Sequence, residues 1–293
     1  MQEFRGTGVA LVTPFKKDLS VDTEALTAIV QHCIFHQVDY LVVLGTTGES
    51  ATLTPAEKDL VIATVIDANA GKLPLMLGVG GNNTVQVVEE LQTRDLSAFA
   101  GILSVSPYYN RPTQAGIYAH YSAIAEATDK PIMLYNVPGR TGSDIAPATT
   151  LSLARGFKNI IGIKEAKGDI AQVMKLIKDR PEGFLVVSGD DMLALPTVLA
   201  GGDGVISVLG QGIPQLFVPM INSGLKGDVK AAYANHYQLM DGVNHIFAEG
   251  NPAGIKALLA AQGLCHPIVR LPLLPATVGL SQTLATYFEG LRL

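Results

Sequence analysis

Short apolar segments recur along the chain, with starts about 20 to 35 residues apart. The eight segments are Val9–Val12, Tyr40–Leu44, Leu75–Val79, Ile102–Val105, Ile132–Leu134, Ile160–Ile163, Phe184–Val187 and Gly204–Val208. Unbroken apolar segments of this length are typical of strands buried on both faces, as in a parallel sheet. The pattern therefore predicts eight parallel strands.

Between these segments, apolar positions recur with the spacing of a helix. The first intervening helix is predicted to be entered through Ser20, with acidic residues in its first turn. The second opens with Thr54-Pro55-Ala56-Glu57, a capping box with proline at the first helical position. Its predicted inward face comprises Leu60, Val61, Thr64, Val65 and Ala68. A later helix is predicted to be capped by Asp169.

Strands that alternate with helices, without two-residue hairpins, indicate parallel β/α units, and eight such units close into a TIM barrel. We predict an α/β fold with a (β/α)8 barrel over residues 1–224 and a helical region over residues 225–293. The helices of that region are expected near Asp228–Glu249, Pro252–Ala261 and Pro275–Leu291. A doubly wound open sheet is the alternative, although Gly78–Asn83 lacks the third glycine of the dinucleotide-binding fingerprint.

Composition narrows the class of protein. Of the 293 residues, 48% are hydrophobic and 16% are charged, which indicates a large core and a subunit interface. A net charge of −5 provides no basic surface for nucleic acid. Cys33 and Cys265 fit a reducing compartment. With no targeting segment at its start and no apolar run of membrane-spanning length, the chain is expected to be a cytoplasmic protein without a membrane partner.

Polar residues follow the predicted strands directly. They occur in Gly45–Ser50, Pro107–Pro112, Tyr135–Thr141, Lys164-Glu165 and Ser188–Asp191. Because the chemistry of a TIM barrel lies at the carboxyl ends of its strands, these residues are expected to meet on one rim. Each set also has a simpler reading, in which the Gly-Thr-Thr-Gly segment is a plain turn, Tyr108 and Tyr109 are interface aromatics, and Arg140 pairs with a surface carboxylate.

Lys164 is the strongest single candidate. The apolar strand Ile160–Ile163 leads straight into it, so its ammonium would lie where water is scarce. Desolvation favours the neutral amine, which is a nucleophile toward ketones. The simpler reading is a lysine that extends from the barrel rim into solvent. Lys167 is the rival lysine, but it falls in a polar turn and is expected to be solvated.

Metal and cofactor sites are not expected. His32 and His36 lie four residues apart on a predicted helix, without a further ligand at suitable spacing, so they are interpreted as surface or interface residues. Gly201–Gly204 has the composition of the glycine turns near barrel phosphate sites, and tight packing into the eighth strand explains it equally well.

Four motifs, in order and at the predicted strand ends, carry a resemblance to a known family. They are Gly45-Thr46-Thr47-Gly48-Glu49, Tyr108-Tyr109-Asn110-Arg111-Pro112, Tyr135-Asn136-Val137-Pro138-Gly139-Arg140-Thr141 and Ile161-Gly162-Ile163-Lys164-Glu165. Together they resemble the dihydrodipicolinate synthase family of pyruvate-dependent class I aldolases, over the whole chain. The family's reaction condenses pyruvate with L-aspartate 4-semialdehyde to give 4-hydroxy-tetrahydrodipicolinate, in lysine and diaminopimelate biosynthesis.

The resemblance implies a role for each matching residue. Lys164 would form the Schiff base with pyruvate, and Tyr135, Thr46 and Tyr109 would relay protons, with Tyr109 contributed by a neighbouring subunit. The positions that match substrate-binding residues are Thr47 for the pyruvate carboxylate, Arg140 for the aldehyde's carboxylate, and Gly189 and Ile206 for the backbone lining of the pyruvate pocket. The family's usual assembly, a tetramer built from two tight dimers, implies a homo-oligomer.

One site departs from the family pattern. Lysine-sensitive bacterial members bind lysine between tight-dimer partners, and their two helix histidines and one glutamate correspond here to Pro55, Lys58 and Gln86. Asn82 and Tyr108 are retained. Loss of a carboxylate and gain of a cation should weaken the binding of a cationic amino acid. We expect weak or absent inhibition by lysine.

Two alternative functions remain at this point. One is a sister aldolase on the same scaffold, such as N-acetylneuraminate lyase or a keto-deoxy sugar acid aldolase. Those enzymes generally differ around Thr46, Arg111 and Arg140, where this chain keeps the synthase pattern. The other is a catalytically silent barrel that serves as a binding protein, which the intact lysine, tyrosines and threonine disfavour.

Overall fold

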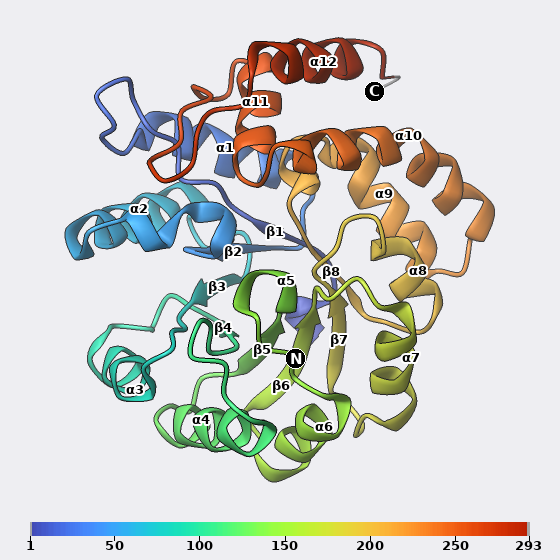
Figure 1. Cartoon of the computed structure of the whole chain (residues 1–293). Coiled ribbons are helices and arrows are strands. Elements are labelled where there is room, and N and C mark those ends of the chain that lie inside the picture. The colour runs from blue at the N-terminus through green and yellow to red at the C-terminus, as the bar shows by residue number, and fades with distance from the viewer. Residues whose placement is uncertain (1, 292–293) are drawn as a thin grey trace.

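Eight parallel strands close into a barrel in a computed structural model that describes residues 2–291 (Figure 1). They are β1 (Gly6–Ala10), β2 (Tyr40–Val43), β3 (Leu75–Gly78), β4 (Gly101–Val105), β5 (Ile132–Asn136), β6 (Ile160–Glu165), β7 (Leu185–Ser188) and β8 (Gly204–Ser207). Each strand pairs with its neighbour in chain order, and β1 pairs with β8. The predicted TIM barrel is confirmed, and the open sheet is excluded by this closure.

The first strand is the one that the hydrophobic pattern placed least well. Strand β1 starts at Gly6, three residues before the predicted start, because Gly6-Thr7-Gly8 has no large apolar side chain to mark it. Glycine is required at position 8, since a Cβ there would lie 2.2 Å from the Tyr40 ring. The crowded barrel interior thus explains why this strand lacks an apolar signature.

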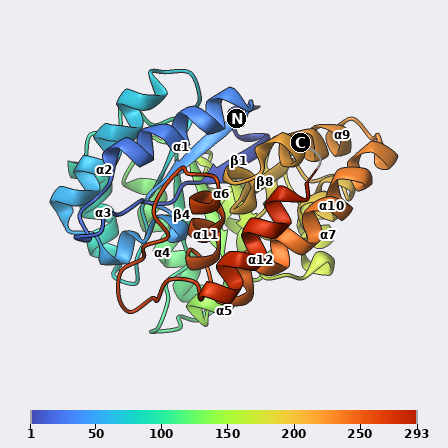
Figure 2. The same ribbon diagram turned by 90° about the horizontal axis from the view of Figure 1, so that it is seen from above.

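Helices surround the barrel. They are α1 (Thr23–Phe35), α2 (Pro55–Asn69), α3 (Thr84–Thr93), α4 (Gln114–Glu126), α5 (Pro138–Thr141), α6 (Pro147–Gly156), α7 (Ile170–Asp179), α8 (Ala194–Leu199) and α9 (Pro214–Leu225). Three further helices, α10 (Val229–Ala248), α11 (Ala253–Ala261) and α12 (Val278–Glu289), follow the barrel, close to the positions expected from the sequence. Figure 2 shows α11 and α12 packed together outside the barrel. Within residues 2–291, no helix is both long and apolar enough to cross a bilayer.

The predicted helix starts are largely confirmed. Thr54 and Glu57 form the expected capping box of α2, and the Asp169 carboxylate accepts two backbone N–H groups of α7. Two details were wrong. Helix α1 is capped by Asp22 rather than entered through Ser20, because the Asp22 carboxylate accepts the Ala25 N–H. On α2, Leu60 is 45% exposed rather than facing inward.

Side chains pack in two layers, one inside the barrel and one between the strands and the helices. The interior layer includes Phe4, Tyr40, Met76, Met133, Tyr135, Ile161, Val187 and Ile206. Ile160 and Ile163 belong instead to the outer layer. Strand β6 can supply both because its pairing with β5 shifts by one residue, from Ile132 opposite Ile160 to Met133 opposite Gly162. Such a bulge changes which face later side chains point to.

The segment after α11 returns to the barrel and is held there by Arg270. Its guanidinium donates to the Glu57 carboxylate and to the backbone carbonyls of Leu19 and Thr52. The hydrogen bonds that Glu57 accepts from Arg270 and, to a smaller extent, from the Thr54 N–H lower its pKa to about 2. The carboxylate that closes the α2 capping box therefore also fastens the C-terminal region to the barrel.

The Glu57 carboxylate should contribute measurable stability. We expect Glu57→Gln to lower the free energy of unfolding at pH 7 by about 2 kcal/mol, the usual range for hydrogen bonds to charged groups. Because the folded pKa of Glu57 is about 2, below an unfolded value of about 4.3, its contribution is complete above the latter and is lost as pH falls through about 2. The difference in Tm between variant and parent should therefore be larger at pH 7 than at pH 3. Equal differences at both pH values would contradict the assignment.

Candidate active site

A cavity of about 480 Å3 opens at the carboxyl ends of the strands. Its wall combines residues at the ends of β2, β3, β4 and β5 and in the segments that follow them, among them Thr46, Tyr108, Tyr135 and Arg140. The C-terminal region completes it, through Asn251, Pro252, Pro272 and Leu273. Residues from the first three predicted sets therefore line one cavity, whereas Lys164 and Ser188–Asp191 are not among its lining residues.

Lys164 points into the barrel beside Tyr135. Its Nζ lies 4.2 Å from the centroid of the Tyr135 ring, and the two residues are 5% and 7% exposed. The register of β5 and β6 sets this arrangement, since Tyr135 is directly opposite Lys164. The amine is enclosed rather than extended into solvent. Such a site suits a nucleophile that must capture a carbonyl compound away from bulk water.

Gly189 borders the same lysine. A Cβ at this position would lie 2.8 Å from Lys164 Cε and 2.6 Å from Ala166 Cβ. Any larger residue would therefore displace the lysine side chain. Ile206 is fully buried in the interior wall, on β8.

The loop after β2 carries both threonines. Thr46 begins a short 3-10 turn, Thr46–Gly48, and lines the cavity with its side chain exposed. Thr47 is buried, and its Oγ1 accepts a hydrogen bond of 3.0 Å from the Asn251 side chain. The Asn251 Oδ1 is buried and has no partner among residues 2–291. This pair therefore presents polar groups next to the cavity wall.

Tyr109 lies apart from the other candidates. Its backbone has a φ of 70°, and its N–H donates to the Thr141 carbonyl at 3.2 Å. The side chain is 88% exposed. Within the described part of the chain, no hydrogen bond joins its phenol to Tyr135 or Thr46. The three members of the expected relay are therefore not connected within a single chain.

Arg140 lies on α5, directly after β5. It lines the cavity, and its Nη2 donates to the Asn251 carbonyl at 3.4 Å. No carboxylate of residues 2–291 forms an ion pair with it, so the surface-pair reading receives no support. Its guanidinium retains donors for a carboxylate ligand.

The structure also shows the surroundings of Lys167, the rival nucleophile, and of His32, a candidate metal ligand. Lys167 is expected from the sequence to be solvated, but its ammonium contacts Asp144 at 2.8 Å and Asp169 at 3.6 Å. Burial, with a smaller effect of His36, lowers the pKa of His32 to about 4. Across residues 2–291, no group of three or more His, Cys, Asp or Glu side chains could hold a metal ion.

The glycine turn before β8 serves packing. A Cβ on Gly204 would lie 2.0 Å from the Gly6 carbonyl oxygen, and one on Gly202 would meet Thr197 at 2.7 Å. Gly204 begins the strand, so this turn is at the end of the barrel opposite the cavity. Close packing therefore explains it without a phosphate site.

Sequence reasoning missed an ion pair beneath the rim. Glu49 follows the two threonines in a left-handed conformation, with φ 52°, and its carboxylate bonds to the ammonium of Lys256 on α11. Both side chains are buried, and Lys256 Nζ also lies 4.2 Å from the Phe15 ring centroid. Burial lowers the pKa of Lys256, and Glu49 opposes that shift. No local pattern could reveal this pair, because 207 residues separate its members.

The loop that carries Thr46 and Thr47 should depend on this ion pair. We expect Lys256→Met to cost about 3–5 kcal/mol of stability, since it leaves the Glu49 carboxylate buried without a partner. Adding Glu49→Gln should recover part of that loss. Urea unfolding of both variants would test this. A Lys256→Met protein as stable as the parent would show that the pair is unimportant.

The chain matches one known protein family over nearly its whole length. The model of the Dihydrodipicolinate synthetase family matches residues 3–289. The 4-hydroxy-tetrahydrodipicolinate synthase of Flavobacterium psychrophilum is 59% identical over 291 residues, covering 99% of each chain. The protein of the same name from Phocaeicola vulgatus is 47% identical, covering 98% of this chain and 95% of its own. Among solved structures, dihydrodipicolinate synthase from Cyanidioschyzon merolae with lysine bound is 37% identical, with a TM-score of 0.92, and the match covers 98% of each chain.

Proposed function

The chain belongs to the dihydrodipicolinate synthetase family, and we propose that Lys164 is the residue on which its chemistry takes place. The enzyme is a lyase that condenses pyruvate with L-aspartate 4-semialdehyde to give 4-hydroxy-tetrahydrodipicolinate, in lysine and diaminopimelate biosynthesis. The observation that carries the assignment is the enclosed Lys164 amine, 4.2 Å from the Tyr135 ring centroid at the carboxyl end of the barrel. The relatives reported above carry the synthase name and not that of a sister aldolase.

The reaction begins when the Lys164 amine attacks the keto carbon of pyruvate. The resulting carbinolamine loses water after its hydroxyl receives a proton, which leaves an iminium ion. Loss of a methyl proton from this iminium gives an enamine, whose carbon adds to the aldehyde of the second substrate. The amino group of that substrate then attacks the iminium carbon, closes the ring and releases Lys164.

Tyr135 is the proposed proton carrier for these steps. Its ring contacts the Lys164 amine and it lines the cavity, so its hydroxyl can serve both the departing water and the methyl proton. Thr46, on the same cavity wall, would link it to the phenol of Tyr109. Because Tyr109 is 88% exposed on its own chain, the third member of the relay would come from a neighbouring subunit.

The remaining candidates are assigned to substrate binding. Thr47 would donate to the pyruvate carboxylate from the buried loop after β2. Arg140, which has no carboxylate partner among residues 2–291, would bind the carboxylate of the aldehyde substrate. Gly189 and Ile206 would line the pyruvate pocket, the former by leaving space beside the lysine.

We propose further features of the whole protein. Residues 1–224 would form the catalytic barrel and residues 225–293 a helical region, with the division just before the end of α9 at Leu225. The exposed Tyr109 supports assembly as a tetramer of two tight dimers, in which it completes a partner's site. A biosynthetic role and two free thiols, Cys33 and Cys265, support a cytoplasmic location.

Substitution of the central residues should separate nucleophile from proton carrier. We expect Lys164→Ala to abolish activity and Tyr135→Phe to lower kcat by about 100- to 10,000-fold, the usual effect of losing a general acid–base group. Incubation with pyruvate and borohydride should leave a stable adduct on Lys164, located by peptide mass, and Lys164→Ala should leave none. An active Lys164→Ala enzyme, or an adduct on Lys167, would contradict the assignment. A coupled assay with aspartate semialdehyde should give turnover where N-acetylneuraminate gives none.

Feedback by lysine should be weak or absent. In this chain Lys58 lines the cavity with Tyr108, on whose carbonyl the Asn82 side chain donates a hydrogen bond, and Gln86 lies exposed on α3. An ammonium beside a site for a cationic amino acid opposes binding. Steady-state rates should therefore change little when lysine is added, and Lys58→His with Gln86→Glu should increase sensitivity. Strong inhibition of the unchanged enzyme at low lysine concentration would contradict the prediction.

A further inference from the structure

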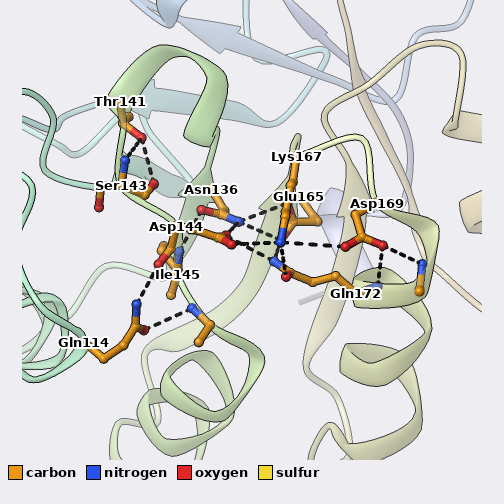
Figure 3. Close-up of polar contacts among 12 residues, drawn as sticks. Gln114, Asn136, Thr141, Ser143, Asp144, Ile145, Glu165, Lys167, Asp169 and Gln172 are labelled. Carbon is orange, nitrogen blue, oxygen red and sulfur yellow. Dashed lines mark hydrogen bonds and ion pairs between the residues drawn. The ribbon is translucent and has the colours of Figure 1, made fainter.

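Behind Tyr135 and Lys164, on the outer side of the barrel, lies a buried hydrogen-bonded pair. Its members are Asn136 and Glu165, the residues that follow those two in the chain, and they are 0% and 2% exposed. Figure 3 shows their side chains directed toward each other between β5 and β6. Because successive strand residues point to opposite faces, Asn136 and Glu165 point outward where Tyr135 and Lys164 point inward.

The contact between the two side chains is direct. Asn136 Nδ2 lies 3.0 Å from each oxygen of the Glu165 carboxylate and 2.8 Å from Asp144 Oδ1. The Asn136 Oδ1 accepts the Ile145 N–H at 2.9 Å. Every polar atom of the asparagine amide therefore has a partner, and its orientation is fixed by donor and acceptor type.

Glu165 is surrounded by donors. Its carboxylate also accepts from the Lys167 N–H at 2.9 Å and from Gln172 Nε2 at 3.1 Å. Burial raises the pKa of Glu165, and the hydrogen bonds from Asn136 and Gln172 oppose that shift. Because three nitrogens donate to the Glu165 carboxylate, the position accommodates a carboxylate and disfavours an amide.

The same cluster reaches the segment that follows α5, the short helix that carries Arg140. Asp144, in this segment, bonds to the ammonium of Lys167 at 2.8 Å and to Gln172 Nε2 at 3.3 Å (Figure 3). Hydrogen bonding to Lys167 and Asn136 outweighs burial and lowers the pKa of Asp144. The cluster thus connects β5, β6, α7 and the segment after α5.

The pair lies beyond the bulge in β6, at the ends of the two strands that carry Tyr135 and Lys164. The bulge between Ile160 and Gly162 interrupts regular pairing with β5, and bulged strands bend and twist locally. Asn136 and Glu165 pair after the bulge, at the last position of the two strands. A side-chain contact there constrains the two strand ends that bear the reacting groups.

We propose that Asn136 and Glu165 are positioning residues, whose hydrogen bond on the outer face of the barrel fixes the Tyr135 phenol relative to the Lys164 amine on the inner face. The inference rests on the proposed roles of those two residues. The side chains of both residues bond to groups on the outer side of the barrel, so they act on the reaction only through Tyr135 and Lys164.

The test is a double-mutant cycle between Glu165→Gln and Tyr135→Phe. Glu165→Gln places an amide nitrogen against N–H donors, and we expect it to lower kcat by about 100-fold, the effect of a misplacement near 1 Å. In the Tyr135→Phe background, where no phenol remains to be positioned, the same change should cost less than about 3-fold, because groups that act as a unit are not additive. Effects that multiply fully would overturn the proposal.

Two further variants keep the cycle interpretable. Asp203 lies just before β8, at the end of the barrel opposite the cavity, and its buried carboxylate accepts the Val186 N–H. Asp203→Asn should therefore lower Tm without the loss of kcat. If Glu165→Gln fails to fold, Asn136→Ser replaces it in the cycle. Asn136→Ser should lower kcat in the parent enzyme and should change kcat much less in the Tyr135→Phe background. A kcat that follows Tm alike in all three variants would reduce the pair to a structural role and overturn the proposal.

Borohydride trapping separates this proposal from the proposed function. The parent enzyme should form the pyruvate adduct on Lys164, and Glu165→Gln should form the same adduct more slowly. If the parent forms none on Lys164, the proposed function and this proposal fail together. If the parent forms it and the cycle is additive, only the positioning role fails.

Discussion

One extra residue in β6 determines what the inside of the barrel contains. The shift in pairing with β5 leaves Ile161 without a partner of its own, and this side chain packs in the interior. A Cβ on the next residue, Gly162, would lie 2.7 Å from the Leu185 carbonyl oxygen of β7, so only glycine fits there. Beyond this point Ile163 packs outward and Lys164 points inward, against Tyr135. Without the extra residue, the amine would belong to the other face of the strand.

The C-terminal region belongs to the catalytic structure as much as the barrel loops do. Three of its residues contact the segment that follows β2: Asn251 bonds to Thr47, Lys256 to Glu49, and Arg270 to Glu57. Two of these contacts are buried or nearly so. The loop with the threonines is therefore held between the barrel and a part of the chain 200 residues away.

The features predicted correctly from sequence patterns are those that depend on residues close together in the chain. The eight strands, the capping box at Thr54 and the cap at Asp169 follow from burial on two faces and from unpaired N–H groups, both of which a short window of sequence reveals. The site residues at strand ends followed from the barrel rule together with a family resemblance. Of these, the structure brings Lys164, Tyr135 and Gly189 together and lines the cavity with Thr46 and Arg140, while Tyr109 lies apart.

Contacts between distant segments could not be predicted. The exposure of Leu60, the Glu49–Lys256 pair and the Asn251–Thr47 hydrogen bond depend on how elements far apart in the chain meet. The bulge in β6 was also missed, because an unbroken apolar run looks the same whether or not one residue is unpaired.

The contacts from Asn251, Lys256 and Arg270 impose an order on biosynthesis. The ribosome makes the N-terminal part of a chain first. All eight strands precede these three residues, so every barrel strand is synthesised before the counter-ion of the Glu49 carboxylate. A nascent chain released before Lys256 would therefore carry the threonine loop without the cation that neutralises its buried carboxylate.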